Sequence, residues 1–365
     1  MAEQLEIKAI TKKILRESLD TNAYWKDEVA PIPKSKAQWL LTNDRIDEED
    51  YCGLIGYENQ KMIGFIYLLP DLVNMVNAAP QKAYWMILWW VDTKYKDTVF
   101  STYLFNEAIN HAGKKVLIKS YAEHVNEFYE KQPFDVIISR LRYTIFFSLD
   151  TSILLGRFSF LKPFSFFIEQ ADRLSGKLIR SLNKVKTKNR TTALRYEYIN
   201  QLDEEAWQFI KPLCKDDLIY KSKEYVNWQL SSIQYTQMPV DGKATYASLQ
   251  VGAGKNMGIS TFNVFKGERQ IGLISYVLNH KECNIKYFLV ADEQDYMLCV
   301  DALLDNVIAS KANFIFTDDE KLAAHITKRY TTVYTYKVTK KGLVHKEAKM
   351  DTKPLHLQNH DGHFY

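Results

Sequence analysis

Apolar and polar residues alternate in blocks between Gln81 and Phe134 in a pattern that predicts strand, helix and strand. Ala83–Val91 is an apolar, aromatic run of strand length, and the polar segment Asp92–Thr98 follows it. Val99–His111 then carries apolar residues at the spacing of one face of a helix. Val116–Tyr121 is predicted as the next strand. The rest of the chain can be laid out around this unit.

The polar segment between the first strand and the helix is a candidate anion site. The first N–H groups of a helix have no partner inside the helix, and the helix dipole adds positive potential there. Lys94 and Lys96 lie in this segment. A phosphate-bearing cofactor fits such a turn, but so does an ordinary β-α connection with solvated charges, and the pattern leaves both interpretations open.

The order of predicted elements occurs twice along the chain. Residues 1–150 predict β-α-α-β-β-β-α-β-α-β, with 70–80 as a loop or an insertion, and the pattern restarts at residue 192 without obvious residue identity. We therefore predict an α/β (α+β) fold with a mixed sheet and two tandem domains. The predicted parts are a first domain at 1–150, a basic helical linker at 151–191, a second domain at 192–340 and a loose polar tail at 341–365.

The segment Thr151–Arg195 differs from its surroundings in charge. It holds ten Lys and Arg residues against two acidic residues. Its apolar residues recur at helical spacing, which predicts a basic amphipathic helix: Phe164, Phe167, Ile168, Ala171, Leu174, Leu178, Leu182 and Val185. One interpretation is an interdomain helix docked by its apolar stripe. The other is a segment, 157–190, that contacts a membrane surface or an acidic partner.

Composition narrows the class of protein. Hydrophobic residues make up 46% and charged residues 25% of the chain, as in globular proteins. The net charge of +4 is too small to indicate a nucleic-acid partner. The four cysteines form no CxxC pair, which favours reduced thiols in a cytoplasmic protein.

The sequence lacks the usual patterns of a signal peptide, a membrane-spanning helix and a zinc site. The polar N-terminus lacks the apolar core of a signal peptide, and the most apolar segment, Met86–Val91, is too short to cross a bilayer. The histidines near the end of the chain lack the short spacing of a zinc site, so we predict no metal.

Two stretches of the first half resemble the GNAT superfamily of acyl-CoA-dependent N-acyltransferases. They are Val91–Ile109 (VDTKYKDTVFSTYLFNEAI) and Phe128–Phe134 (FYEKQPF). In that family a valine-ending strand precedes Arg/Gln-x-x-Gly-x-Gly/Ala at the opening of a helix. Lys96 takes the Arg/Gln place, Val99 the first glycine and Ser101 the second small residue.

The family also shows a later Phe-Tyr-x-x-x-Gly-Phe-like segment. Tyr129 takes its tyrosine place, with Pro133 where glycine is usual and Phe134 at the final aromatic. The resemblance covers 1–150 in element order and 192–340 more weakly.

Departures from the family pattern distinguish the two halves. The family's glycines let the backbone approach the pyrophosphate of CoA, and Val99 adds a branched side chain at that point. In the second half the matching stretch is Val290–Leu303, where Asp295 replaces the basic or amide residue. A carboxylate beside a pyrophosphate is unfavourable, so we expect the first half to bind the cofactor.

The resemblance implies a site for acetyl-CoA or another acyl-CoA. A bulge in the strand Ala83–Val91 would splay it from the next strand, and backbone N–H groups near Leu88–Trp90 would polarise the thioester carbonyl. Tyr129 corresponds to the family's acid, and Glu123 and His124 are candidate bases. The implied cofactor-binding residues are Leu88, Trp89, Trp90, Val91, Lys96, Asp97, Thr98, Val99, Phe100 and Ser101.

These features predict an enzyme, an acyltransferase that moves an acyl group from CoA to an amine, and the resemblance implies that this group is acetyl. The acceptor, a small molecule or a peptide, would be bound between the domains. One alternative is a catalytically inactive GNAT-fold binding module, which Val99 and Asp295 favour. Another is a tRNA-dependent aminoacyl or peptidyl transferase, whose support is the basic linker.

Overall fold

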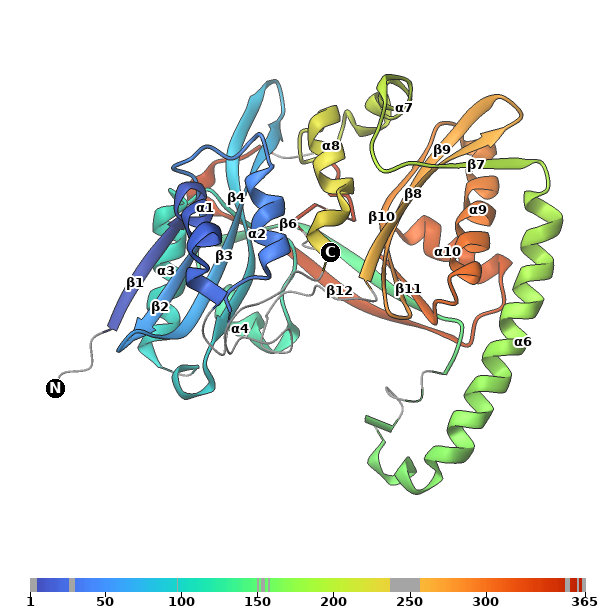
Figure 1. Ribbon diagram of the computed structural model, residues 1–365, viewed down its shortest axis with the longest axis horizontal. Helices are drawn as coiled ribbons and strands as arrows, with labels where there is room; N and C mark the ends of the chain where they lie inside the picture. Colours follow the sequence, from blue (N-terminus) through green and yellow to red (C-terminus); the bar gives the residue numbers. More distant parts are fainter. Residues whose placement is uncertain are drawn as a thin grey trace. The chain divides into compact units, whose positions relative to one another are not determined.

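The computed structural model describes residues 5–25, 30–96, 98–149, 151, 155–156, 158–236, 257–351, 355–359 and 361–362. The chain has a mixed α/β fold with one mixed sheet of 12 strands, which confirms the predicted fold class (Figure 1). Contacts divide it into two compact units. Unit 1 comprises Met1–Ser139, Cys214–Lys255 and Lys340–Tyr365, and unit 2 comprises Arg140–Leu213 and Asn256–Thr339.

Unit 1 contains an antiparallel meander that ends in one parallel pair. Strands β1 to β4 follow one another as antiparallel neighbours, β5 lies parallel to β4, and β12 pairs antiparallel with β5. The strands are β1 (Leu5–Thr11), β2 (Tyr51–Glu58), β3 (Lys61–Met75), β4 (Ala78–Val91), β5 (Val116–Ile118) and β12 (Tyr334–His345). The helices are α1 (Lys12–Thr21), α2 (Lys34–Leu41), α3 (Val99–His111), α4 (Asn126–Glu130) and α8 (Lys223–Leu230).

Unit 2 repeats this arrangement. Its strands β7 to β10 are antiparallel neighbours, β11 lies parallel to β10, and β6 pairs antiparallel with β11. The strands are β6 (Phe134–Phe146), β7 (Leu194–Tyr198), β8 (Met257–Lys266), β9 (Arg269–Asn279), β10 (Glu282–Val290) and β11 (Phe314–Thr317). The helices are α6 (Ser165–Thr191), α7 (Glu204–Ile210), α9 (Tyr296–Ala309) and α10 (Glu320–Arg329).

The described elements follow the same order twice along the chain. The first run is β1-α1-α2-β2-β3-β4-α3-β5-α4-β6, and after α6 the second run is β7-α7-α8-β8-β9-β10-α9-β11-α10-β12. This confirms the repeated element order expected from the sequence. The contact grouping cuts across that order, because α8 and residues 340–345 of β12 belong to unit 1, whereas residues 140–146 of β6 belong to unit 2. The domain boundaries at residues 150 and 192 stay a prediction.

Two hydrophobic clusters fill unit 1, because successive residues of its strands point to opposite faces of the sheet. One cluster includes Trp85 and residues of α1, α2 and α8, and the other includes Met86 and residues of α3 and α4. Trp39 on α2 and Trp228 on α8 stack with ring centroids 3.9 Å apart, and each indole N–H donates to the other's carbonyl at 2.7 Å. This reciprocal pair joins two helices that are far apart in sequence.

The expectation of a loop at 70–80 is wrong. β3 continues through Pro70 to Met75, and β4 begins at Ala78. The extension has a partner in a distant part of the chain: the Tyr220 N–H donates to the Leu72 carbonyl at 2.8 Å, and the Asn74 N–H donates to the Leu218 carbonyl at 2.8 Å. Local composition does not reveal such a partner.

The described residues of the predicted tail also pack, so the expectation that 341–365 is a loose tail does not hold for them. β12 continues to His345, and Leu343 pairs with Ile118 of β5. Further on, Asp361 is buried and forms an ion pair with Lys221. This segment is therefore part of unit 1.

The predicted basic helix is present as α6, and no helix among the described residues is long and apolar enough to cross a membrane. The expectation that α6 docks by its apolar stripe is wrong, because Leu174 and Leu178 are exposed while Gly176 and Asn183 are buried.

Candidate active site

Strand β4 carries a bulge at Ile87 and separates from its parallel neighbour β5 beyond it. The register with β3 shifts at this residue. β5 pairs with β4 at Tyr84 and Trp85, before the bulge, and no described residue of β5 pairs with β4 after it. A bulge bends its strand and increases the local twist. The structure thus confirms the bulge that the resemblance implies, and the pairing of β4 with β5 ends before it.

Two backbone amides of β4 point into this gap. The Asp92 N–H donates to the Ile63 carbonyl of β3 at 2.8 Å, and Trp90 pairs with Phe65 of the same strand. Because every second residue of a strand directs its amide to the same neighbour, the N–H groups of Trp89 and Val91 point away from β3. They are therefore placed to donate to a carbonyl oxygen in the gap.

Phe100 fixes the start of α3 against the sheet. A Cβ atom built on Gly56 of β2 would lie 2.3 Å from the Phe100 ring, and one on Gly64 of β3 would lie 2.9 Å from it. The ring therefore occupies space that exists because these two residues are glycines. The Val99 side chain, in contrast, is 85% exposed. The branched side chain that replaces the family's glycine thus projects into solvent at the helix N-terminus.

The turn before α3 is held by local hydrogen bonds. The Lys94 N–H donates to the Asp92 carboxylate at 3.0 Å, and the Tyr95 hydroxyl donates to the Glu58 carboxylate. Both lysines are exposed, but the Lys94 ammonium lies 3.5 Å from the same Glu58 carboxylate, whereas Lys96 forms no ion pair among the described residues. Lys96 is therefore the better placed of the two lysines to reach a bound anion.

The predicted cofactor residues fall on two adjoining elements. Leu88, Trp89, Trp90 and Val91 end β4, Thr98 is the N-cap of α3, and Val99, Phe100 and Ser101 form its first turn. Asp97 lies outside the described residues. The side chains of Phe100 and Ser101 are buried, so at these two positions mainly the backbone is available to a ligand.

Tyr129 lies in an aromatic cluster that reaches β4. Its ring centroid is 6.0 Å from that of Phe105 and 4.6 Å from that of Tyr121, and Phe105 lies 4.9 Å from Trp89. Burial raises the pKa of the Tyr129 hydroxyl above its usual range. The hydroxyl therefore stays protonated at neutral pH, as a proton donor requires.

The Trp89 indole adds a polar group to this cluster. Its Nε1 atom is buried and has no hydrogen-bond partner among the described residues. A buried donor without a partner costs about 1–3 kcal/mol. A ligand acceptor beside Trp89 would remove that cost.

The two candidate bases lie just before Tyr129 in the chain. Glu123 and His124 are exposed on the short 3-10 helix η3 (Glu123–Val125), which leads directly into α4. The structure places them near α4 in sequence and leaves their side chains in solvent. Their role as bases stays a prediction.

Unit 2 has the same backbone arrangement with different side chains. Its strand β10 has a register shift at Lys286, and β11 pairs with β10 before that point. A Cβ on Gly272 would lie 2.7 Å from the Cys299 Sγ atom, as Gly64 approaches Phe100 in unit 1. Cys299 lies nine residues after Val290, and Phe100 lies nine residues after Val91. Cys299 and Phe100 therefore occupy equivalent positions in the two units, in agreement with the match of Val290–Leu303 to the first half that was drawn from the sequence.

In unit 2 the residue that corresponds to Lys96 is an aspartate, Asp295. Asp295 is buried, and its Oδ2 atom lies 2.5 Å from the Arg269 guanidinium while Lys266 lies 3.8 Å from Oδ1. The carboxylate at the position that corresponds to Lys96 is thus paired within the protein. Which half binds the cofactor stays a prediction.

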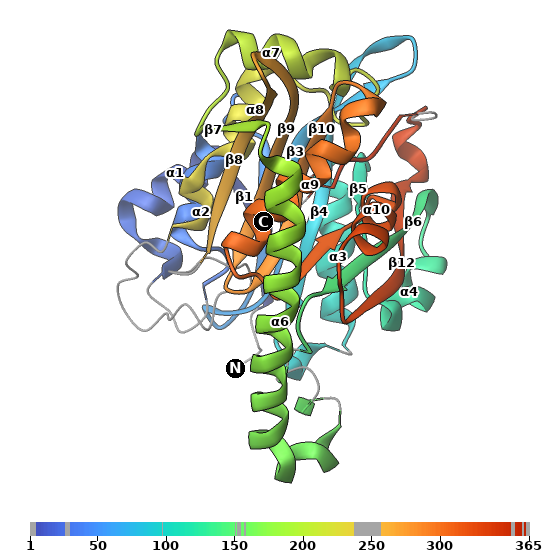
Figure 2. The same cartoon turned by 90° about the vertical axis from the view of Figure 1, so that its right-hand side faces the viewer.

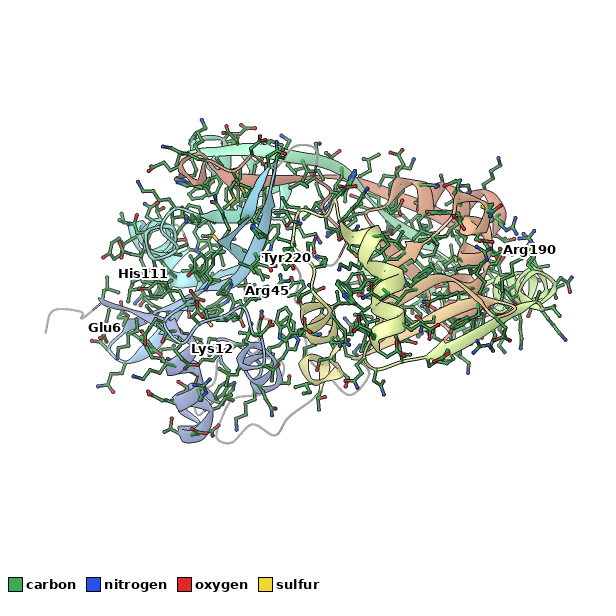
Figure 3. All side chains as sticks on the ribbon, turned by 90° about the horizontal axis from the view of Figure 1, so that it is seen from above. Glu6, Lys12, Arg45, His111, Arg190 and Tyr220 are labelled. Atoms are coloured by element: carbon green, nitrogen blue, oxygen red, sulfur yellow. The ribbon has the colours of Figure 1, made fainter. Side chains whose placement is uncertain are left out.

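A buried polar cluster in unit 1 was not found from the sequence. Asp71 on β3 accepts hydrogen bonds from Arg45 at 2.9 Å, Tyr225 at 2.7 Å and the Trp85 indole at 3.2 Å. Arg45 also lies beside Tyr220 (Figure 3). Burial raises the pKa of Asp71, and Arg45 opposes that shift. The one signal in the sequence is an aspartate inside the apolar run Leu68–Val73.

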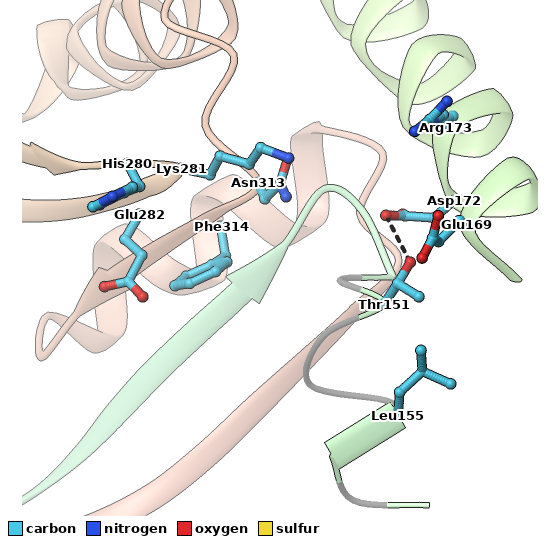
Figure 4. A pocket seen from close by; sticks show the side chains of 10 residues that line it. All are labelled: Thr151, Leu155, Glu169, Asp172, Arg173, His280, Lys281, Glu282, Asn313 and Phe314. Atoms are coloured by element: carbon cyan, nitrogen blue, oxygen red, sulfur yellow. Dashed lines mark hydrogen bonds between the residues drawn. The ribbon is translucent and has the colours of Figure 1, made fainter. Parts of the chain in front are cut away.

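The described part of unit 2 contains a cavity of about 500 Å³ beside the β9–β10 turn (Figure 4). Glu169, Asp172 and Arg173 of α6 and Glu282 of β10 line it. Asp172 also accepts a hydrogen bond from the Leu149 N–H at 2.8 Å. The cavity lies at the start of β10, whereas the bulge at Lys286 lies further along that strand. Among the described residues, no group of three or more His, Cys, Asp or Glu side chains could hold a metal ion.

No family model matches the sequence, and no curated protein matches it. The chain is similar in structure to a GCN5-related N-acetyltransferase from Kribbella flavida, with a TM-score of 0.48, 8% identity and coverage of 94% of this chain and 73% of that one. It is similar to a conserved protein of unknown function from Enterococcus faecalis described as a probable N-acyltransferase, with a TM-score of 0.45, 8% identity and coverage of 94% and 73%.

A third similar structure is a putative acetyltransferase from Pyrococcus horikoshii, with a TM-score of 0.48, 11% identity and coverage of 97% of this chain and 95% of that one. At identities this low the similarity concerns the fold alone and does not indicate which residues are functional.

Proposed function

We propose that unit 1 catalyses transfer of an acyl group from acyl-CoA to an amine. The observation that carries this proposal is the splayed pair of strands β4 and β5, with the amides of Trp89 and Val91 directed into the gap. Preorganised N–H donors aimed at a carbonyl oxygen stabilise the negative charge that develops when a nucleophile attacks. An amine attack on a thioester needs such donors.

The side chains around the gap suit the remaining proton transfers. The leaving thiolate must gain a proton, and the protonated hydroxyl of Tyr129 supplies one from α4. The amine must lose a proton before attack, and Glu123, His124 or a water molecule between them takes it. Lys96 and the first turn of α3 face the phosphates of CoA.

The test is a calorimetric titration of the full chain with acetyl-CoA and with longer acyl-CoAs. We expect saturable binding that becomes about tenfold weaker in Lys96→Ala, because one charged contact to phosphate is lost. Val99→Asp places a carboxylate at the helix N-terminus and should weaken binding further. Lys131→Ala, which removes another exposed lysine of unit 1, is the matched control and should bind like the parent.

Binding is followed by a screen of amine acceptors for release of free CoA. Binding without release of CoA on any acceptor would favour a binding module with a GNAT-like fold. Absence of binding by every acyl-CoA would overturn the proposal.

A further inference from the structure

The helix α6 packs along α9 of unit 2 with its polar and small residues (Figures 1 and 2). The buried positions of α6 are Gly176, Asn183, Thr187 and Thr191. Asn183 donates from Nδ2 to the Thr331 carbonyl and accepts from the Thr331 N–H, each at 2.9 Å. These bonds set the rotation of the helix about its own axis.

The apolar stripe of α6 consequently faces outward. Phe167 is 70% exposed, Leu174 69% and Leu178 62%. Their spacing of seven and four residues keeps them on one face of the helix. Exposed aromatic residues also gather at its N-terminal end, at Phe160 and Phe164. Soluble proteins rarely expose such a continuous apolar surface unless it binds a partner.

Basic side chains border this stripe. α6 carries seven Lys and Arg residues against two acidic residues. Arg173, Lys177 and Lys184 are exposed and each lies one residue before a stripe position, so all three border the stripe on one side. Of the two acidic residues, Asp172 is engaged with the Leu149 N–H. The outward face therefore combines apolar and cationic groups.

We propose that the outward face of α6 binds an anionic lipid surface, with the helix lying in the plane of the membrane interface. An interfacial helix buries aromatic and aliphatic side chains at the boundary of the acyl chains while its Lys and Arg residues meet anionic head groups. Both features occur side by side on α6. This inference does not depend on the proposed acyl transfer.

The positive charge of the outward face of α6 favours a lipid surface over a second copy of this chain as its partner. Two α6 helices that packed stripe against stripe would bring two strongly basic flanks together, and such like charges repel. An anionic membrane neutralises the same charges. The stripe also contains leucines and Val185 besides its aromatic residues, which suits acyl chains.

The experiment is flotation of the full chain with vesicles of phosphatidylcholine alone or mixed with phosphatidylglycerol. We expect binding to the mixed vesicles, weaker binding in high salt and little binding to phosphatidylcholine alone. The triple variant Phe167→Ser/Leu174→Ser/Leu178→Ser should lower the partition coefficient by about a hundredfold. Lys177→Glu/Lys184→Glu should abolish the preference for phosphatidylglycerol.

Matched controls replace exposed residues of the same kind away from α6. Val136→Ser/Tyr336→Ser removes two exposed apolar side chains, and Lys131→Glu/Lys215→Glu reverses two exposed lysines. Both should bind like the parent. Unchanged thermal unfolding of the α6 variants shows that they fold, as expected for exposed positions.

Two results would overturn the proposal. One is failure of the parent chain to bind phosphatidylglycerol vesicles at low salt. The other is binding that the triple variant retains. Sedimentation of the parent as a dimer that the triple variant converts to a monomer, without vesicle binding, would assign the face to a second copy.

Discussion

Asn183 and Thr331 exchange two hydrogen bonds of 2.9 Å, and this pair joins α6 to the chain segment that follows α10. The Asn183 side chain is fully buried. A helix with a conspicuous apolar stripe is thus held by a polar contact on its other face. The pair therefore determines which surface of α6 meets solvent.

Replacing Asn183 by alanine should destabilise unit 2. The substitution removes both hydrogen bonds and leaves the Thr331 N–H and carbonyl without their partner, which costs about 1–3 kcal/mol. Equilibrium unfolding in urea measures the loss in the free energy of unfolding. Asn189→Ala, at an exposed position of the same helix, is the control and should change it by less than about 0.5 kcal/mol. Equal stability of the two variants would contradict the structural role of the pair.

The close approach of Gly56 to Phe100 predicts a large effect of a single methyl group. Gly56→Ala should lower the free energy of unfolding by about 1–3 kcal/mol, because its Cβ would lie 2.3 Å from the ring. Adding Phe100→Ala to this variant should cost less than the sum of the two single changes, since the clash is then absent.

Gly258→Ala serves as the control for Gly56→Ala. A Cβ at Gly258 has no neighbour within 4 Å. Chemical denaturation of the four variants measures both the single costs and their coupling. Strict additivity of Gly56→Ala and Phe100→Ala would show that the ring does not occupy the space left by the glycine.

Removing the Tyr129 hydroxyl should slow acyl transfer without weakening cofactor binding. If the hydroxyl protonates the leaving thiolate, Tyr129→Phe lowers kcat by about a hundredfold and leaves KM for acyl-CoA unchanged. Steady-state kinetics on an acceptor identified by the CoA-release screen measure this. Tyr121→Phe is the control, because its ring centroid lies 4.6 Å from that of Tyr129 while its hydroxyl donates to the Asn126 side-chain oxygen. A parallel loss in both variants would assign Tyr129 to packing.

Lys286 makes the stability of unit 2 depend on pH. Burial lowers the pKa of Lys286 from its ordinary value of 10.5 to about 7. Between these two values the unfolded chain binds a proton at Lys286 that the folded chain does not, so the contribution of Lys286 to the free energy of unfolding rises as pH increases from 7 to 10. Lys286→Met should flatten this rise, because no lysine then titrates at the bulge.

Urea unfolding at several pH values between 7 and 10 measures the slope. Lys281→Met, which removes an exposed lysine at the start of the same hairpin strand, should keep the slope of the parent. A parent chain whose stability falls across this range, with Lys286→Met unchanged relative to it, would contradict the prediction.

Local pattern predicted the element order and the strand and helix on which the candidate site of unit 1 lies. The apolar run Ala83–Val91 lies in β4, and the residues with helical spacing after it form α3. Strands and helices bury side chains at different intervals along the chain, so the two patterns can be told apart. The resemblance to the GNAT superfamily, and not periodicity, pointed to Tyr129, which the structure places in one cluster with Trp89. It also identified Asp295 as the residue that sets unit 2 apart.

Only the tertiary structure decided the features that depend on distant partners. β3 passes through Pro70 because the chain around Tyr220 supplies its hydrogen bonds, and Asp71 is buried because Arg45 and Tyr225 surround it. The stripe of α6 looked like a docking surface because apolar residues usually face the core. Amphipathic spacing shows that a helix has two faces, but the contact between Asn183 and Thr331 decides which of them is buried.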